Sequence, residues 1–166
     1  MNETVKTILK RRSCRQFNKE IISDEDLLTI IRCGIHAPTA LNKQNLFFIG
    51  IKNQEIINKY KDYLKDDIYY GAKAIILCFE RFEYDFTSLN LGAAIENMLI
   101  ASESLGYQSC WIHGSVKFDT EEGRKFLKEL LSLDKEYRVL DSIAIGKSDN
   151  KVLKPLARNT KNDKII

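Results

Sequence analysis

The sequence predicts an α+β sandwich. About five helical segments and four strand-like segments follow one another in mixed order along the chain. The chain does not open with a strand, a glycine loop and a helix, which argues against a doubly wound fold. It also contains no G-x-G-x-x-G or G-x-x-x-x-G-K-[ST] motif, which disfavours a Rossmann dinucleotide site and a P-loop.

Length and composition bound the class of protein. The 166 residues have the length of one domain, and no repeat or low-complexity block suggests a boundary within residues 1–166. An apolar share of 44% excludes a wholly disordered chain. The 26 basic and 23 acidic residues leave a formal net charge of +3, so composition alone does not indicate a nucleic-acid-binding protein.

Two helices are expected before the first strand. Residues 4–12 place Val5, Ile8 and Leu9 on one helical face. Ser23 is a good N-cap for the second helix, because its hydroxyl can accept a hydrogen bond from the backbone N–H of Asp26. The residues of this helix expected to face the core are Leu27, Ile30, Ile31 and Ile35.

Strands and helices then alternate. Residues 46–51 are expected to form a strand, and Asn53 to cap a third helix. Residues 73–80 are expected to form a buried strand. The segment 87–105 has the length of a helix and is apolar nearly all round, which is typical of a domain centre or an oligomer interface. Gly106 is expected to end it.

The last part of the chain supplies two more strands and one helix. Residues 108–113 are expected to form a strand, and Asp119 or Thr120 to cap a helix. Residues 137–145 alternate between polar and apolar side chains, as expected for a final strand. Residues 147–166 form a polar, basic tail.

Secretion, membrane spanning and metal binding are not expected. The N-terminus lacks an apolar run of signal-peptide length, and no stretch approaches the roughly 18 apolar residues of a membrane span. The four cysteines form no C-x-x-C pair and no cluster with the two histidines. We therefore expect free thiols in a reducing cytoplasm.

A basic stretch at the end of the first helix is suited to binding phosphate. Lys10, Arg11, Arg12 and Arg15 place four cations within six residues, with the hydroxyl of Ser13 among them. Guanidinium groups match phosphate oxygens bidentately. A solvated basic helix end is the alternative explanation, since cations are favourable at helix C-termini.

Two later stretches are also suited to a ligand. The amide and hydroxyl groups of residues 38–44 suit a planar polar heterocycle, although an ordinary loop has the same composition. Residues 106–114 hold the only tryptophan, Trp111, shortly before a glycine that would admit close backbone approach to a ligand. A core strand with one packed aromatic residue is the alternative there.

Together, in this order and spacing, the three stretches resemble the nitroreductase family of flavin enzymes. The family's Arg-x-Ser-x-Arg/Lys-x-Phe opening is matched by Arg11, Ser13, Arg15 and Phe17. Its Ala/Ser-Pro-Ser-x-x-Asn-x-Gln loop is matched by Ala37, Pro38, Thr39, Asn42 and Gln44. Its Leu-Gly, Ser-Cys-Trp-Ile and late Ile-Gly segments are matched by residues 105–106, 109–112 and 145–146.

The resemblance implies a homodimer with shared FMN sites and a central mixed or antiparallel sheet flanked by helices. Arg11, Ser13 and Arg158 would hold the FMN phosphate, with Lys154 as a weaker candidate. Arg12 would lie along the ribityl chain or the ring edge. The tail, residues 147–166, is expected to reach the partner subunit.

The flavin ring would be held by three further groups of residues. Arg15 would point at the N1–C2=O side of the ring, where positive charge raises the potential of the flavin. The loop from the other subunit would supply Pro38, Thr39, Asn42 and Gln44. The backbone of Ile112, His113 and Gly114 would approach flavin N5.

The implied activity is a ping-pong transfer of a hydride from NADH or NADPH, through flavin N5, to a nitroaromatic, a quinone or a similar small electrophile. Such chemistry needs no nucleophile or general base from the protein. A non-catalytic flavin carrier or redox sensor of the same fold stays open as an alternative, as does a basic interaction module. The sequence departs from the family pattern at Thr39, at Asn45–Leu46 where Pro-Trp is common, and in the trimmed segment 65–72.

Overall fold

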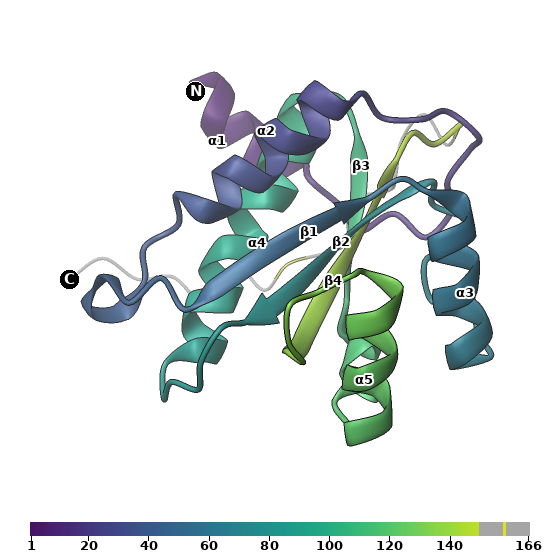
Figure 1. Cartoon of the computed structure of the whole chain (residues 1–166). Helices are drawn as coiled ribbons and strands as arrows, with labels where there is room; N and C mark the ends of the chain where they lie inside the picture. The colour runs from purple at the N-terminus through teal and green to yellow at the C-terminus, as the bar shows by residue number, and fades with distance from the viewer. Residues whose placement is uncertain (150–157, 159–166) are drawn as a thin grey trace.

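The computed structural model describes residues 1–149 and residue 158, and its elements follow in the expected order (Figure 1). The α-helices are α1 (Glu3–Lys10), α2 (Asp24–Ile35), α3 (Gln54–Leu64), α4 (Thr87–Ser104) and α5 (Glu121–Leu130). The strands are β1 (Leu46–Ile51), β2 (Ala74–Glu80), β3 (Gln108–Ile112) and β4 (Arg138–Gly146). Two short 3-10 helices are η1 (Ala40–Asn42) and η2 (His113–Phe118). The α+β class is confirmed.

The four strands form one sheet in the order β1-β2-β4-β3, and every pairing is antiparallel. In the described part of the chain, β2 and β4 are therefore central and β1 and β3 are edges. The alternation expected over residues 137–145 is wrong. Residues 141–146 are all buried, because helices cover both faces of this central strand.

Helices lie on both faces of the sheet (Figure 1). The helices α1, α2 and α4 lie on one face, and α3 and α5 on the other. Successive residues of β2 point to opposite faces, so Ile76 packs with Ile30 and Met98 while Leu77 packs with Tyr60. We call these groups the α1/α2/α4 layer and the α3/α5 layer.

The helix caps agree with the sequence analysis. The side chains of Ser23, Asn53 and Thr120 each accept a backbone N–H bond at the start of α2, α3 and α5. Gly106, with a φ of 78°, follows the end of α4 in the left-handed region that favours glycine. The first helix ends at Lys10 rather than at residue 12.

Val5, Ile8 and Leu9 lie on α1 and are exposed. Two other details differ from expectation. Leu27, Ile30 and Ile31 are buried, but Ile35, the last residue of α2, is 59% exposed. The third strand ends one residue early, and His113 opens η2.

Candidate functional site

The basic stretch after α1 lies against α4. The N–H of Arg11 donates to the carbonyl oxygen of Thr7, and its Nε lies 3.3 Å from Oε1 of Glu96 on α4. Nη1 of Arg12 donates to the carbonyl oxygens of Leu9 and Arg11, each at 2.7 Å. Both Nε atoms are buried; Nε of Arg12 makes no hydrogen bond among the described residues, whereas Nε of Arg11 has only the ion pair with Glu96. A buried donor without a partner is the kind of group that a ligand satisfies.

The chain then runs along the edge of β3. Ser13 forms a bridge to Ser109, and the N–H of Cys14 donates to the carbonyl oxygen of Ser109 at 2.9 Å. Burial raises the pKa of the Cys110 thiol, and the guanidinium of Arg15 opposes that rise. Ser13 and Arg15 are exposed. The predicted phosphate-binding residues thus lie at the start of an edge strand and are open to solvent.

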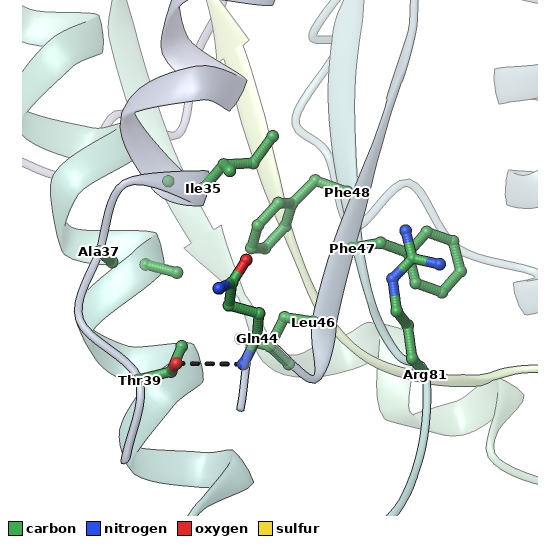
Figure 2. A pocket seen from close by; sticks show the side chains of 10 residues that line it. Ile35, Ala37, Thr39, Gln44, Leu46, Phe47, Phe48 and Arg81 are labelled. Atoms are coloured by element: carbon green, nitrogen blue, oxygen red, sulfur yellow. Dashed lines mark hydrogen bonds between the residues drawn. The ribbon is translucent and has the colours of Figure 1, made fainter. Parts of the chain in front are cut away.

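The second predicted stretch forms a tight turn beside a cavity of about 330 Å³ (Figure 2). The N–H of Gln44 donates to Oγ1 of Thr39, and Nε2 of Gln44 donates to Oδ1 of Asn42, both at 3.1 Å. Leu41, Asn42 and Gln44 have φ values of 52°, 52° and 49°, in the left-handed region that favours glycine. Pro38 is exposed at the start of the turn. Strain of this kind persists only where the surroundings hold it.

Asn45 and Asn90 hold the turn in place. Asn45 is fully buried; its Nδ2 donates to Oγ1 of Thr87 at 2.6 Å and its Oδ1 accepts from Nδ2 of Asn90 at 2.9 Å. Oδ1 of Asn90 accepts from the N–H of Ala40 at 2.9 Å, and Thr87 donates onward to Glu80. These bonds attach both ends of the turn to α4. The residue that stands where the family has proline is therefore an anchor of the loop.

The third predicted stretch lies at the end of β3. Ile112 is buried, whereas the His113 side chain is 79% exposed. A Cβ at Gly114 would lie 3.2 Å from Cδ1 of Ile68, so this backbone is closely packed. Nδ1 of His113 lies 2.6 Å from Oδ1 of Asp141.

The sequence did not single out Asp141, Asn45 or Asn90 as functional residues.

The three stretches do not come together within one chain. The basic stretch lies at the start of β3 and His113 at its end. The η1 turn leads into β1, the edge strand opposite β3 in the sheet. Arg158 is exposed, and Lys154 lies outside the described residues.

Other kinds of site find no support in the described residues. They contain no group of three or more His, Cys, Asp or Glu side chains that could hold a metal ion. The four cysteines are free thiols, and Cys14, Cys78 and Cys110 are buried. Among the helices described, none is long and apolar enough to cross a membrane.

Comparisons with known proteins agree on one family. The nitroreductase family model matches residues 8–74 and 61–147. A protein of Archaeoglobus fulgidus, provisionally named an NADH dehydrogenase/NAD(P)H nitroreductase, is 31% identical over 152 residues, which cover 88% of this chain and 86% of that protein. The NADPH-flavin oxidoreductase of Vibrio harveyi is 28% identical and covers 93% of this chain and 70% of its own. A crystal structure of a nitroreductase with bound FMN from Bacteroides fragilis matches with a TM-score of 0.89 at 25% identity, over 100% of both chains.

Proposed function

Because the chain belongs to the nitroreductase family, we propose that it is an FMN-dependent oxidoreductase that uses NADH or NADPH to reduce a small electrophile such as a nitroaromatic or a quinone. When bound, FMN supplies the redox chemistry, since a flavin accepts a hydride from a nicotinamide and passes it to an acceptor. The chain itself binds the cofactor, tunes it and leaves room for donor and acceptor in turn, in a ping-pong sequence.

The observation that carries this proposal is the donor set after α1. An FMN phosphate carries a charge of about −1.5 to −2 and requires several donors. The buried Nε of Arg12 makes no hydrogen bond among the described residues, the buried Nε of Arg11 has only the ion pair with Glu96 at 3.3 Å, and Ser13 is open to solvent beside them. We assign Arg11 and Ser13 to the phosphate, with Arg158 from the tail, and Arg12 to the ribityl chain or ring edge. The residues present fit the group.

Arg15 and the end of β3 fit the flavin ring. Arg15 is an exposed cation two residues after Ser13, and we assign it to the N1–C2=O side, where positive charge raises the potential of a flavin. The backbone of Ile112, His113 and Gly114 is assigned to the N5 side. The close packing at Gly114 supports this, because a fixed backbone holds its amide groups in place.

We propose that two copies of the chain share each site. The turn carrying Thr39, Asn42 and Gln44 lies away from β3 of its own chain, so in this proposal it serves the site of the partner (Figure 1). Exposed apolar side chains on α1, α2 and α4 supply a surface for that contact. The tail, residues 147–166, is proposed to reach across to the partner.

The proposed partners and location follow the same reasoning. The electron donor and the acceptor are small molecules, and neither a nucleic acid nor a membrane takes part. The free thiols of the four cysteines support a reducing, cytoplasmic location.

The visible spectrum of the purified protein tests the proposal. We expect a yellow protein with flavin absorbance at about 450 nm. This absorbance should bleach when NADH or NADPH is added without oxygen. A colourless protein that takes up no added FMN contradicts the proposal. A yellow protein that neither nucleotide bleaches favours a flavin carrier or redox sensor instead.

Loss of one guanidinium tests the phosphate assignment. Arg11→Ala should weaken FMN binding by roughly 1.5–3 kcal/mol, the contribution of a hydrogen bond to a charged group. The matched control is Lys10→Ala, because Lys10 is the preceding cation and pairs with Glu103 at 3.0 Å on the exposed side of α1. Titration with FMN measures the FMN affinity of both variants. Equal losses in the two variants would show a general charge effect rather than a phosphate contact.

A further inference from the structure

A hollow of about 490 Å³ lies between the start of α4, the end of β3 and the start of β4. Thr87 and Leu91 line it from α4, and Trp111, His113 and Asp141 line it from the sheet side. We call it the β3–α4 hollow. It holds a polar arrangement that the binding of FMN, as proposed above, does not use.

The centre of that arrangement is the carboxylate of Asp141, which is 4% exposed. Its Oδ2 accepts from Nε1 of Trp111 at 2.7 Å, and its Oδ1 lies 2.6 Å from Nδ1 of His113. A carboxylate oxygen accepts hydrogen bonds, so we assign the hydrogen between these two atoms to Nδ1 of His113. The His113 side chain is 79% exposed, and its Nε2 is the ring nitrogen not bound to Asp141.

The free energy of folding alone gives little reason to pair His113 with Asp141. A buried carboxylate costs several kcal/mol unless it is well paired, and an exposed imidazole is a weak partner for it. A buried carboxylate that fixes one nitrogen of a histidine and leaves the other free is, however, how proteins orient a histidine for proton transfer. Trp111 holds the second carboxylate oxygen and so fixes the direction of the first.

We propose that His113 is the proton donor to the acceptor, and that the acceptor is a molecule reduced at oxygen, such as a quinone. This inference rests on the proposed function. Reduction of a quinone to a hydroquinone takes two electrons and two protons, and NAD(P)H supplies both electrons with one proton as a hydride. In this step His113 starts as the imidazolium, with a hydrogen on both ring nitrogens. The second proton leaves Nε2 as the N–H bond breaks and an O–H bond forms on the quinone, which leaves a neutral imidazole with its hydrogen on Nδ1. The imidazole then recovers a proton from solvent.

Other ionisable groups near His113 are compatible with its proposed role as proton donor. Tyr84, Asp85 and Arg138 line the same hollow, and Cys78 lies opposite Asp141 on β2, where burial raises the pKa of its thiol. Histidine is the side chain whose charge ordinarily changes between about pH 5 and 8. A pH dependence that is lost in His113→Gln and kept in His36→Gln would therefore identify His113 as its source.

The two half-reactions separate this proposal from the proposed function. In anaerobic stopped-flow experiments on the FMN-loaded protein, NADH or NADPH bleaches the flavin and a soluble benzoquinone then restores its colour. His113→Gln should slow the return of colour about 10²-fold more than it slows the bleaching, the usual range of general acid catalysis. The control is His36→Gln, which removes the other histidine of the chain at the end of α2 and should leave both rates unchanged.

The outcomes are distinct. A wild-type protein that the nucleotides do not bleach contradicts the proposed function and this proposal with it. Normal bleaching of His113→Gln with a wild-type rate of reoxidation overturns the proton donor alone. The wild-type rate of reoxidation should fall as the pH rises, because the imidazolium is lost, and this fall should disappear in His113→Gln. Added imidazole should restore reoxidation in His113→Ala, which a merely structural role would not allow.

Nuclear magnetic resonance of the protein without FMN gives a readout that does not depend on activity. With two histidines in the chain, the His36→Gln variant assigns both imidazole signals. The neutral ring of His113 should carry its hydrogen on Nδ1, and Asp141→Asn should remove that preference. A His113 ring that carries its hydrogen on Nε2 in the wild type contradicts the orientation by Asp141.

Discussion

On one face of the sheet, α3 and α5 leave no large apolar side chain exposed, whereas α1, α2 and α4 on the other face leave several. The α3/α5 layer closes over a stack of aromatic rings from Tyr60, Tyr63, Phe118 and Phe126. The exposed apolar residues of the α1/α2/α4 layer are Val5, Ile8, Leu9, Leu28, Ile35 and Leu89.

This difference separates a layer that one chain covers by itself from a layer that the proposed dimer would cover. Single exposed apolar residues are normal on any protein surface, but a group confined to one helical layer indicates a contact. The same layer carries Glu96, which pairs with Arg11, and Asn90, which holds the η1 turn. The α1/α2/α4 layer, which leaves apolar side chains exposed, thus also supports the residues proposed to bind FMN. Four substitutions test this comparison.

The largest effect is expected in the closed layer. Phe118 is fully buried, with ring centroids 4.2 Å from Tyr60 and 4.7 Å from Tyr63. Phe118→Ala should lower the free energy of unfolding by about 3–5 kcal/mol, because the cavity cannot refill. Urea unfolding measures this loss. Phe82→Ala is the control at a 48% exposed position, and equal losses in the two variants would contradict a closed α3/α5 layer.

The next effect concerns the polar attachment of the η1 turn. Asn90→Ala leaves the N–H of Ala40 and Oδ1 of Asn45 without their partner, which should cost about 1–3 kcal/mol of stability and also weaken FMN binding. The control is Asn97→Ala on the same helix, which removes a single bond to the carbonyl oxygen of Cys33. If FMN affinity falls equally in both variants, the turn does not depend on Asn90.

A charge on the open layer should affect association more than folding. Ile8 is 45% exposed on α1, so Ile8→Asp should change the stability of the single chain little. It should raise the dissociation constant of the dimer at least tenfold, about 1.4 kcal/mol, by placing an unpaired charge in the contact. Sedimentation measures this constant. Lys125→Asp, at an exposed position on α5, should leave it unchanged. A dimer that tolerates Ile8→Asp contradicts the assignment of this face.

The smallest effect is expected in the pH dependence of stability at the contact between Asp26 of α2 and Tyr107, which lies three residues beyond the end of α4. The hydroxyl of Tyr107 donates to Asp26 at 2.8 Å and lowers the pKa of that carboxyl. A carboxyl with a lowered pKa adds stability above its unfolded pKa of about 4, and this stability is lost as the pH falls through the lower folded value. Tyr107→Phe should therefore flatten the dependence of the urea midpoint on pH below about pH 4.

Tyr137 and Asp134 offer the matched control for Tyr107→Phe. Tyr137 lowers the pKa of Asp134 in the same way, but the two residues are three positions apart. Such a local bond also forms in part in the unfolded chain, so Tyr137→Phe should change the pH dependence less. A larger change for Tyr137→Phe would contradict this reasoning.

Much of the fold was predictable because its signals are local. The caps at Ser23, Asn53 and Thr120 depend on residues two or three positions away, and the apolar run of β2 marks a central strand. The prediction for Ile35 is wrong because helical periodicity continues to the last residue of α2, where the neighbouring layer no longer covers it. The alternation expected in β4 is wrong because burial on both faces depends on the position of the strand in the sheet.

The site was predictable only where a motif is contiguous. The Arg11–Arg15 stretch and the η1 turn are visible in the sequence, whereas the partners that hold them are distant. Asn45 meets Asn90 across 45 residues, and His113 meets Asp141 across 28. No local pattern distinguishes these residues from other polar side chains. The assignments of Arg11, Ser13, Arg15 and the remaining cofactor residues stay predictions.

The bridge between Ser13 and Ser109 has a consequence for solubility. An edge strand with free backbone groups is a template for pairing with another chain, and proteins that leave such edges open tend to aggregate. By occupying the start of β3, Ser13 and Cys14 cover part of one such edge. Removal of the first 15 residues would expose it together with the Ile and Leu residues of the neighbouring helices. The stretch that we propose to bind phosphate thus also protects an edge of the sheet from pairing with another chain.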